Sequence, residues 1–294
     1  MTEQTLETRL VEFLQGAQPP RGSYFNAMRS SSGHAITMMI RQKRIILATL
    51  ICFLPVAIPV MMVFFSRDPY AQEGLTTFIN LITKVHIQVL CPLLALFFAT
   101  MLIGQDVESQ TIPFILTRPI PRSAWILGRY FAFLCIAGGI MATSIFLTFG
   151  ASTALEGLAV NAGDLKLATH FVGTAGMSLI GYGALMMFLG AVSKRPIIIG
   201  VVIIYGWQPI ANVIPGLIDF FTLKKYVDTL LPSLAEHLMT TKFDTTMGEF
   251  SKLAYEVSPT QAAIALLIIA AAFIMLSVVT VRFRQYATSH AQGD

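Results

Sequence analysis

The residue types that could do chemistry in this chain are few, and none forms a recognisable catalytic cluster. The sequence contains no H-E-x-x-H motif, no G-x-S-x-G turn and no G-x-x-x-x-G-K-[ST] phosphate loop. The three cysteines, Cys52, Cys91 and Cys135, all fall in apolar runs without disulfide or metal-ligand spacing. The fourteen methionines form no M-x-x-M pattern and are explained by core packing. We therefore predict no catalytic residue, no resident cofactor and no metal site.

Three titratable residues stand close to apolar runs and could couple a proton or an ion to movement. Lys84 and His86 lie near the start of the second run, and His170 lies near the start of the fourth. A charge at the centre of a bilayer costs about 2.5–3.5 kcal/mol or more, so carriers that keep one there usually use it. The centres of the apolar runs carry essentially no charge, which disfavours ion-coupled chemistry.

The most unusual stretch is the polar segment from Gly104 to Arg122, GQDVESQTIPFILTRPIPR, which separates the second and third apolar runs. It begins with the acids Asp106 and Glu108 and ends with the arginines Arg118 and Arg122. An apolar protein has little physical reason to place such a segment there unless a partner outside the membrane binds it.

Inside this segment the residue order predicts a short helix at about 111–117. Thr111 can cap it, and Pro113 is tolerated in a first turn, where the amide has no intrahelical partner. The two acids then lie near the positive end of the helix dipole. An apolar ridge suited to a groove on a soluble partner is formed by Phe114, Ile115 and Leu116. The alternative is an ordinary loop whose arginines extend to the lipid headgroups.

The elements that must position this segment are membrane helices. The chain is 55% hydrophobic and 12% charged, about half the charged fraction of a soluble domain. Alternating strand patterns are absent, and each apolar run reaches the roughly 20 residues that a spanning helix needs. Pro55, Pro59 and Pro92 predict kinks in the first two helices. We predict an all-α polytopic membrane protein with six transmembrane helices at about Ile45–Phe65, Val85–Ile103, Tyr130–Phe149, Phe171–Val192, Ile197–Leu217 and Ala262–Val281.

The distribution of basic residues predicts the orientation. Six spans put both termini on one side, and that side holds thirteen of the twenty Lys and Arg residues. Positive charge favours the cytosolic side, so both termini are expected in the cytosol of a protein of the inner (cytoplasmic) membrane. The net charge of +4 then reflects this orientation and contact with anionic lipid, with no nucleic-acid partner implied.

The segments between and around the spans define three regions. Positions 1–22 form a cytosolic amphipathic segment, positions 23–286 the six-span domain, and positions 287–294 a cytosolic tail. Ser23–Arg44 predicts an interfacial elbow helix, or alternatively a basic flank that only fixes topology. The external loop at 218–260 has apolar residues at near-helical spacing, which predicts two or more short helices at the outer face.

From about Ser23 to Tyr286 the chain resembles the ABC-2-type permeases, the membrane subunits of ATP-binding-cassette exporters. The features are the acids before Thr111, the apolar turn after it, the Pro119-Ile120-Pro121-Arg122 run and the pair Gly128-Arg129. Lys194-Arg195-Pro196 and Arg282-Phe283-Arg284 are also similar to that family. One departure is Gln110, where the family commonly has glycine.

The resemblance implies a separate motor. Two ATPase subunits would bind ATP and Mg²⁺ and dock on the polar segment, which becomes a cytosolic coupling helix. The residues implied in coupling are Asp106, Glu108, Thr111, Pro113, Phe114, Ile115, Leu116, Arg118 and Arg122. A second permease protomer, identical or related, would complete the transporter within membrane lipid, and an accessory external protein could join it.

The family's substrate path runs between protomers and is generally lined by the first, second and fifth spans. This implies polar path candidates at Gln88, Trp207, Gln208 and Asn212. Each could instead make a structural hydrogen bond between helices, or simply pack in the core in the case of Trp207. The scarcity of charge favours a hydrophobic or amphipathic cargo. The alternatives are an autonomous secondary carrier using His86, Lys84 or His170, and a non-transporting membrane scaffold or assembly factor.

Overall fold

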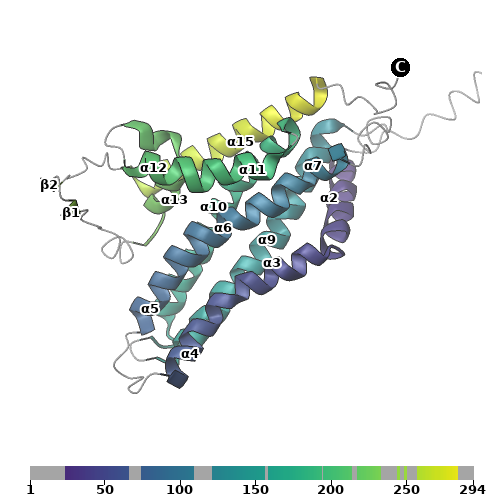
Figure 1. Cartoon of the computed structure of the whole chain (residues 1–294). Helices are drawn as coiled ribbons and strands as arrows, with labels where there is room; N and C mark the ends of the chain where they lie inside the picture. Colours follow the sequence, from purple (N-terminus) through teal and green to yellow (C-terminus); the bar gives the residue numbers. More distant parts are fainter. Residues whose placement is uncertain are drawn as a thin grey trace, which may run out of the picture.

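The computed structural model describes residues 24–65, 74–108, 121–155, 158–193, 195–213, 217–232, 244–245, 248–249 and 257–283. Nearly all of these residues are helical, which confirms the predicted α-helical class (Figure 1). A small departure is a pair of two-residue antiparallel strands, β1 (Asp244–Thr245) and β2 (Gly248–Glu249), inside the predicted external loop. The amphipathic segment at 1–22 and the tail at 287–294 lie outside the described residues.

The first half of the chain forms three helical stretches. The first stretch is α2 (Tyr24–Ile40), followed after a sharp turn by α3 (Lys43–Phe53), η1 (Leu54–Val56) and α4 (Ala57–Phe65). The next is one long helix made of α5 (Gly74–Asn80), η3 (Leu81–Leu90), α6 (Cys91–Leu94), η4 (Ala95–Ala99) and α7 (Thr100–Glu108). The regular helix α9 (Arg122–Ser152) then runs back along it.

The second half adds a central helix and a group of shorter ones. The central helix is α10 (Ala162–Val192), and Asn161 caps it by accepting a hydrogen bond from the backbone N–H of Asp164 at 2.8 Å. The shorter elements are α11 (Pro196–Val201), η5 (Val202–Trp207), α12 (Gln208–Val213), η6 (Leu217–Phe221) and α13 (Leu223–Thr229). The last helix is α15 (Pro259–Phe283).

Within the described residues, five helices are long and apolar enough to cross a membrane. They cover Ile45–Phe65, Gly74–Gly104, Arg122–Ser152, Ala162–Val192 and Pro259–Val281. The predicted fifth span, Ile197–Leu217, differs from the others, because its apolar helix is shorter and covers Pro196–Ala211. The multi-pass membrane architecture is thus confirmed, and a sixth full-length span stays a prediction. The predicted short helices of the external loop are present as η6 and α13.

The second spanning helix begins at Gly74, eleven residues before the predicted start at Val85. Residues 74–84 therefore lie outside the predicted span but inside the observed helix. Tertiary packing explains the difference. Phe78 is fully buried and meets Phe149 and Phe171 edge-on, with ring centroids 5.5 and 5.8 Å apart. These aromatic contacts hold the three helices together beyond the predicted limit of the span.

The prolines predicted to kink the first two helices coincide with irregular backbone. A 3₁₀ segment, η1, interrupts the first helix at Pro55, and Pro92 stands between the π-helical segments η3 and η4. A third π-helical segment, η5, lies in the short helix of the predicted fifth span. Wide turns of this kind recur at functional sites in helices. The π-helical segments therefore lie in the second and fifth predicted spans and η1 lies in the first, whereas α9 and α10 are regular.

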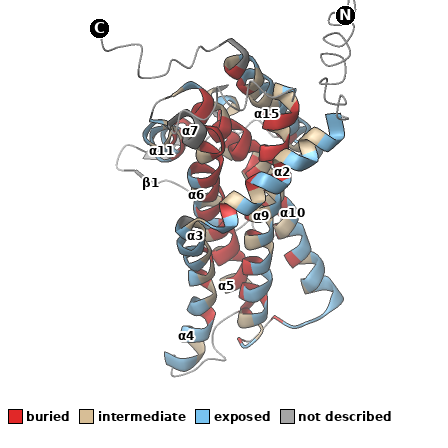
Figure 2. Cartoon of the chain, turned by 90° about the vertical axis from the view of Figure 1, so that its right-hand side faces the viewer, coloured by how far each residue is buried: buried red, intermediate tan, exposed pale blue. Residues whose placement is uncertain are grey.

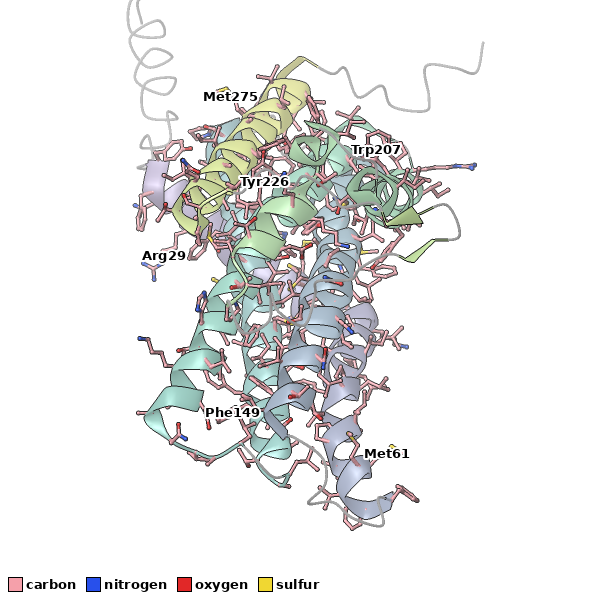
Figure 3. All side chains as sticks on the ribbon, turned by 90° about the vertical axis from the view of Figure 1, so that its left-hand side faces the viewer. Arg29, Met61, Phe149, Trp207, Tyr226 and Met275 are labelled. Atoms are coloured by element: carbon pink, nitrogen blue, oxygen red, sulfur yellow. The ribbon has the colours of Figure 1, made fainter. Side chains whose placement is uncertain are left out.

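The core lies around α10, which packs against α9, α15 and the long second helix. The buried residues gather mainly along the second helix and α10, whereas α3 and α4 are mostly exposed (Figure 2). Their exposed residues, such as Leu50 and Phe64, are apolar, as expected of a surface that faces lipid or another protomer. Met61 and Phe149 lie toward one end of the molecule, and Met275 lies toward the other (Figure 3).

The helix α2 is held against the beginning of α9 by close backbone contact. A Cβ added at Gly128 of α9 would lie 2.5 Å from the carbonyl oxygen of Met28 and 2.8 Å from Cβ of Ser31. The hydroxyl of Ser31 also donates to the backbone oxygen of Trp125 at 2.9 Å. Only glycine permits this approach, so Gly128 fixes where α2 crosses α9.

We expect the change Gly128→Ala to displace α2 and to lower the free energy of unfolding by about 1–3 kcal/mol, because the new methyl group overlaps backbone atoms. Unfolding of the purified protein in detergent, by heat or by increasing dodecyl sulfate, measures this. Gly138→Ala on the same helix is the matched control, since a Cβ there meets nothing within 4 Å. Equal loss of stability in both variants would show that close packing at Gly128 is not the cause.

Candidate functional site

The predicted coupling residues flank a gap in the described structure. Asp106 and Glu108 lie in the last turn of α7, and Arg122 is the first residue of α9. Thr111, Pro113, Phe114, Ile115, Leu116 and Arg118 lie outside the described residues, so the short helix stays a prediction. The acids stand at a helix C-terminus, where the α7 dipole disfavours negative charge. The dipole of α7 therefore does not explain why Asp106 and Glu108 stand at these positions.

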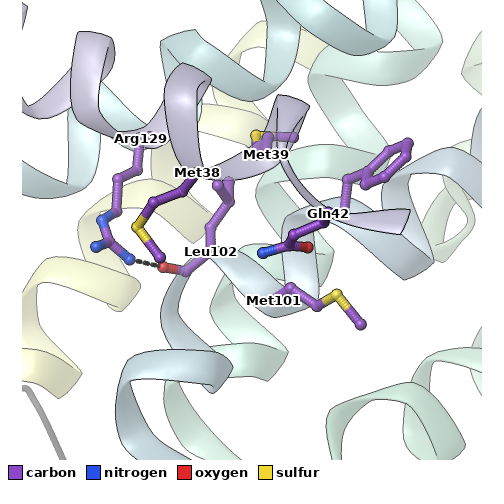
Figure 4. A pocket seen from close by; sticks show the side chains of 8 residues that line it. Met38, Met39, Gln42, Met101, Leu102 and Arg129 are labelled. Carbon is purple, nitrogen blue, oxygen red and sulfur yellow. Dashed lines mark hydrogen bonds between the residues drawn. The ribbon is translucent and has the colours of Figure 1, made fainter. Parts of the chain in front are cut away.

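The two helices that flank this gap are joined by a buried arginine. Arg129 of α9 is only 4% exposed, and its Nη1 donates a hydrogen bond to the backbone oxygen of Leu102 in α7 (Figure 4). Its guanidinium carbon lies 4.5 Å from the centre of the Trp125 ring, in cation–π geometry. A buried charge is tolerated only when it is hydrogen-bonded or paired. Arg129 therefore ties the end of the second helix to the start of the third.

The same arginine lines a small cavity that includes residues of α2. The cavity has a volume of about 20 Å³ and is bounded by Met38, Met39, Gln42, Met101 and Leu102 among others (Figure 4). This is roughly the space of one water molecule. The neighbouring pair Gly128-Arg129 thus joins three elements, because Gly128 admits α2 and Arg129 reaches α7.

A larger, apolar cavity lies where the first, second and fifth predicted spans meet. Its volume is about 350 Å³. We call it the apolar cavity, and its walls are Leu47, Ala48, Ile51, Cys52, Leu93, Leu94, Phe97, Phe98, Met101 and Ile197. These are the spans that the family resemblance implies for a substrate path. Of the polar path candidates whose side chains are described, Gln88, Trp207 and Gln208 do not line it.

Two of those candidates, Gln88 and Gln208, come together in a second cavity of about 160 Å³. Gln208 is buried, and its Oε1 accepts a hydrogen bond from the Tyr182 hydroxyl at 2.6 Å. This is the structural hydrogen bond between helices expected as the alternative to a role in the substrate path. We call this cavity the polar pocket. Its walls are Ile87, Gln88, Val89, Tyr182, Ile204, Tyr205, Gln208, Pro209, Lys224, Val227 and Asp228.

Trp207 lines a different cavity from Gln88, although Gln208 borders both cavities. Trp207 is 46% exposed and lines a neighbouring cavity of about 290 Å³ with Phe220, Phe221 and Phe273. Figure 3 shows Trp207 near one side of the molecule. Asn212 belongs to α12, and its side chain lies outside the described residues.

The external helix α13 contributes charged residues that the sequence pattern does not single out. Its buried residues Leu223 and Val227 hold it against the bundle, where it packs on α10, α12 and α15. On the other face, Lys224 and Asp228 line the polar pocket. Their i, i+4 spacing was visible in the sequence, but their proximity to Gln88 was not.

Burial changes the titration of Asp228. The residue keeps some exposed surface, but its oxygen Oδ1 is fully buried and has no hydrogen-bond partner. Desolvation raises the pKa of this carboxyl from 3.8 to about 6, although the Lys224 charge and a hydrogen bond from Gln88 oppose the change.

The three titratable residues that an ion-coupled carrier would need are not assembled into one buried site. His86 is fully buried, whereas Lys84 and His170 are exposed. The Ser144 hydroxyl donates to the backbone oxygen of Cys52, so it accepts a hydrogen bond from His86 Nε2 at 2.9 Å. His86 thus links the first three predicted spans as a structural group.

Comparison with known proteins agrees with this architecture. A family model described as "ABC-2 family transporter protein" matches residues 32–286, nearly the whole chain. The chain belongs to the ABC-2 transporter family. A search among curated proteins finds no matching relative. Members of this family are membrane components of ABC transporters, and the matched region includes α9, the apolar cavity and the polar pocket.

We expect the protein to lose stability as the pH rises from about 4 to about 6. The unfolded carboxyl of Asp228 ionises near 3.8, whereas the folded one holds its proton up to about 6. Above this window the folded state carries a buried charge, at a cost of at most about 3 kcal/mol.

The unfolding midpoint of the wild type, followed relative to that of Asp228→Asn across pH 4–7, tests this effect. The variant has no carboxyl to titrate at this position, so its advantage should grow with pH. A difference that stays constant over this range would contradict the desolvated state of Asp228.

Proposed function

We propose that this protein is the permease subunit of an ABC exporter, in which a separate ATPase drives movement of a hydrophobic or amphipathic cargo. The single observation that carries the proposal is the family match over residues 32–286. The absence of a phosphate loop from the sequence agrees with it, because ATP hydrolysis then requires another chain.

The joint at Arg129 supports the location of coupling. The segment between α7 and α9 is the predicted docking point, and Arg129 links the two helices at its base through the carbonyl of Leu102. Gly128 adds α2 to the same joint. A displacement of this segment would therefore move α2, the second helix and the third helix together, because the joint resists local bending.

The apolar cavity supports the cargo class. Its walls are Leu, Ile, Ala, Phe, Met and Cys side chains, with no charged side chain among the described residues that line it. Such a cavity suits an acyl chain or another apolar group, since a polar solute would lose its hydration there without new hydrogen bonds.

We expect the double change Phe114→Glu with Leu116→Glu to abolish co-purification of the ATPase. Two charges on the apolar ridge would have to be buried in the groove of the partner. The matched control is Phe221→Glu with Val160→Glu, which places the same charges at two exposed apolar residues away from the predicted coupling segment. If the ATPase stays bound to the first variant, docking does not occur on this ridge.

Filling the apolar cavity should weaken the response to apolar compounds. Ala48→Phe projects a ring into the cavity, and we expect stimulation of ATPase activity by lipophilic compounds to fall about tenfold or more, as binding is lost to overlap. Basal ATPase activity of the purified complex and co-purification of its subunits serve as controls. Stimulation of the wild-type complex by small hydrophilic solutes alone would contradict the proposed cargo class.

A further inference from the structure

The polar pocket is built from five separate elements that the fold brings together, and one of them is η5, which contributes Ile204 and Tyr205. Gln88 comes from η3, Tyr182 from α10, Gln208 from α12, and Lys224 and Asp228 from α13. Its volume of about 160 Å³ is enough for several water molecules or a small polar group. The apolar remainder of its walls would exclude bulk solvent from an occupant.

One hydrogen-bond acceptor in the pocket is left unused. The Tyr182 hydroxyl donates a hydrogen bond to Gln208 Oε1 at 2.6 Å, and the Tyr205 hydroxyl donates to the backbone oxygen of Val89 at 3.3 Å. Asp228 Oδ1 is buried and has no partner among the described residues. A buried acceptor without a donor costs free energy that an incoming donor would recover.

The charges of the pocket favour a neutral donor over a cation. Lys224 and Asp228 both line it, so their opposite charges nearly cancel. The Lys224 charge acts on the carboxyl directly, because it opposes the pKa rise at Asp228. A cationic ligand would gain attraction from Asp228 but meet repulsion from Lys224. A hydroxyl group would meet no such penalty.

The helix that supplies Asp228 is held in place at both ends. Thr222 caps α13 by accepting a hydrogen bond from the Lys225 backbone N–H at 3.4 Å. At the other end, the Thr174 hydroxyl of α10 donates to the backbone oxygen of Leu230 at 3.0 Å. Because α13 is anchored in this way, the carboxylate is positioned before any ligand arrives.

The polar pocket and the apolar cavity share one stripe of the second helix. Val89 lines the polar pocket, whereas Leu93 and Phe97 line the apolar cavity. The three residues are four apart and none is fully buried, so a side of the helix open to the surface runs from one cavity to the other. Eight residues of helix separate the ends, a distance of roughly 12 Å.

We propose that the polar pocket binds the neutral, hydroxyl-bearing head of an amphipathic molecule, with a hydroxyl donating to the Asp228 carboxylate and the apolar tail directed along this stripe to the apolar cavity. The inference rests on the proposed function for its place in transport. The binding itself requires neither the ATPase nor ATP.

Saturable binding to the purified chain in phospholipid nanodiscs tests the proposal. The probe is radiolabelled n-octyl β-D-glucoside below its micelle concentration, with empty nanodiscs subtracted and octyltrimethylammonium as the cationic competitor. We expect Asp228→Leu to weaken glucoside binding at least tenfold, since the acceptor is lost. Asp228→Asn keeps an acceptor oxygen and should stay within about threefold of the wild type. The ammonium compound should not compete.

Two further variants keep the test independent of folding defects. Val89→Phe fills the pocket from its exposed wall without touching Asp228, and should also weaken binding at least tenfold. Asp164→Leu removes a carboxylate outside the pocket and should leave binding unchanged.

Several results would overturn the proposal. The first is the absence of saturable glucoside binding, and the second is glucoside binding that survives both Asp228→Leu and Val89→Phe. The third is a preference for a cation, in which the ammonium compound binds more tightly than the glucoside and Asp228→Asn weakens binding as much as Asp228→Leu does. The variant with Phe114→Glu and Leu116→Glu separates this proposal from the transport function. If this variant loses the ATPase but still binds the glucoside, both the docking site and the polar pocket are confirmed. If the ATPase stays bound, only the docking proposal is contradicted.

Discussion

The arrangement of α2, α7 and α9 depends on one buried cation, Arg129. Arg129 brings a positive charge into the interior, where it is costly unless its donors are satisfied. The bond to the carbonyl of Leu102 meets part of this demand and fixes α7 against α9. Gly128, the preceding residue, removes the side chain that would keep α2 away. Because Gly128 admits α2 and Arg129 binds α7, the three elements α2, α7 and α9 are constrained to move together at this point.

A rigid joint of this kind is useful only if other parts of the molecule can deform. The regular helices α9 and α10 form the frame, and the irregular turns occur in the second helix and in the short η5 helix. The second helix and η5 both contribute walls to the polar pocket, whereas the apolar cavity is bounded by the second helix, α3 and Ile197 of α11. Wide turns leave backbone hydrogen bonds less regular and allow local rearrangement at lower cost than an α-helix does. The molecule is thus rigid near the predicted coupling segment, and its helices can deform more easily around the cavities.

Hydropathy and short motifs predicted much of this fold and less of the site. The bounds Ile45–Phe65, the break at Pro55 and the pair Gly128-Arg129 follow from local sequence. The early start of the second helix does not, because Phe78 is stabilised by rings 71 and 93 residues away in the chain. Asp228 was missed for the same reason. Its i, i+4 relation to Lys224 is typical of any exposed helix, and only the fold places it beside Gln88.

The membrane itself decides which cavity can select a cargo. An apolar group gains little when it moves from lipid into the apolar cavity, because both surroundings are hydrocarbon. That cavity can therefore hold a tail but distinguishes one lipid from another only by shape. A hydrogen bond to a buried acceptor discriminates more strongly, since a molecule that lacks the donor leaves the acceptor unpaired. Selectivity in this permease should therefore depend on Asp228 and its neighbours, and the apolar cavity should determine chain length and bulk.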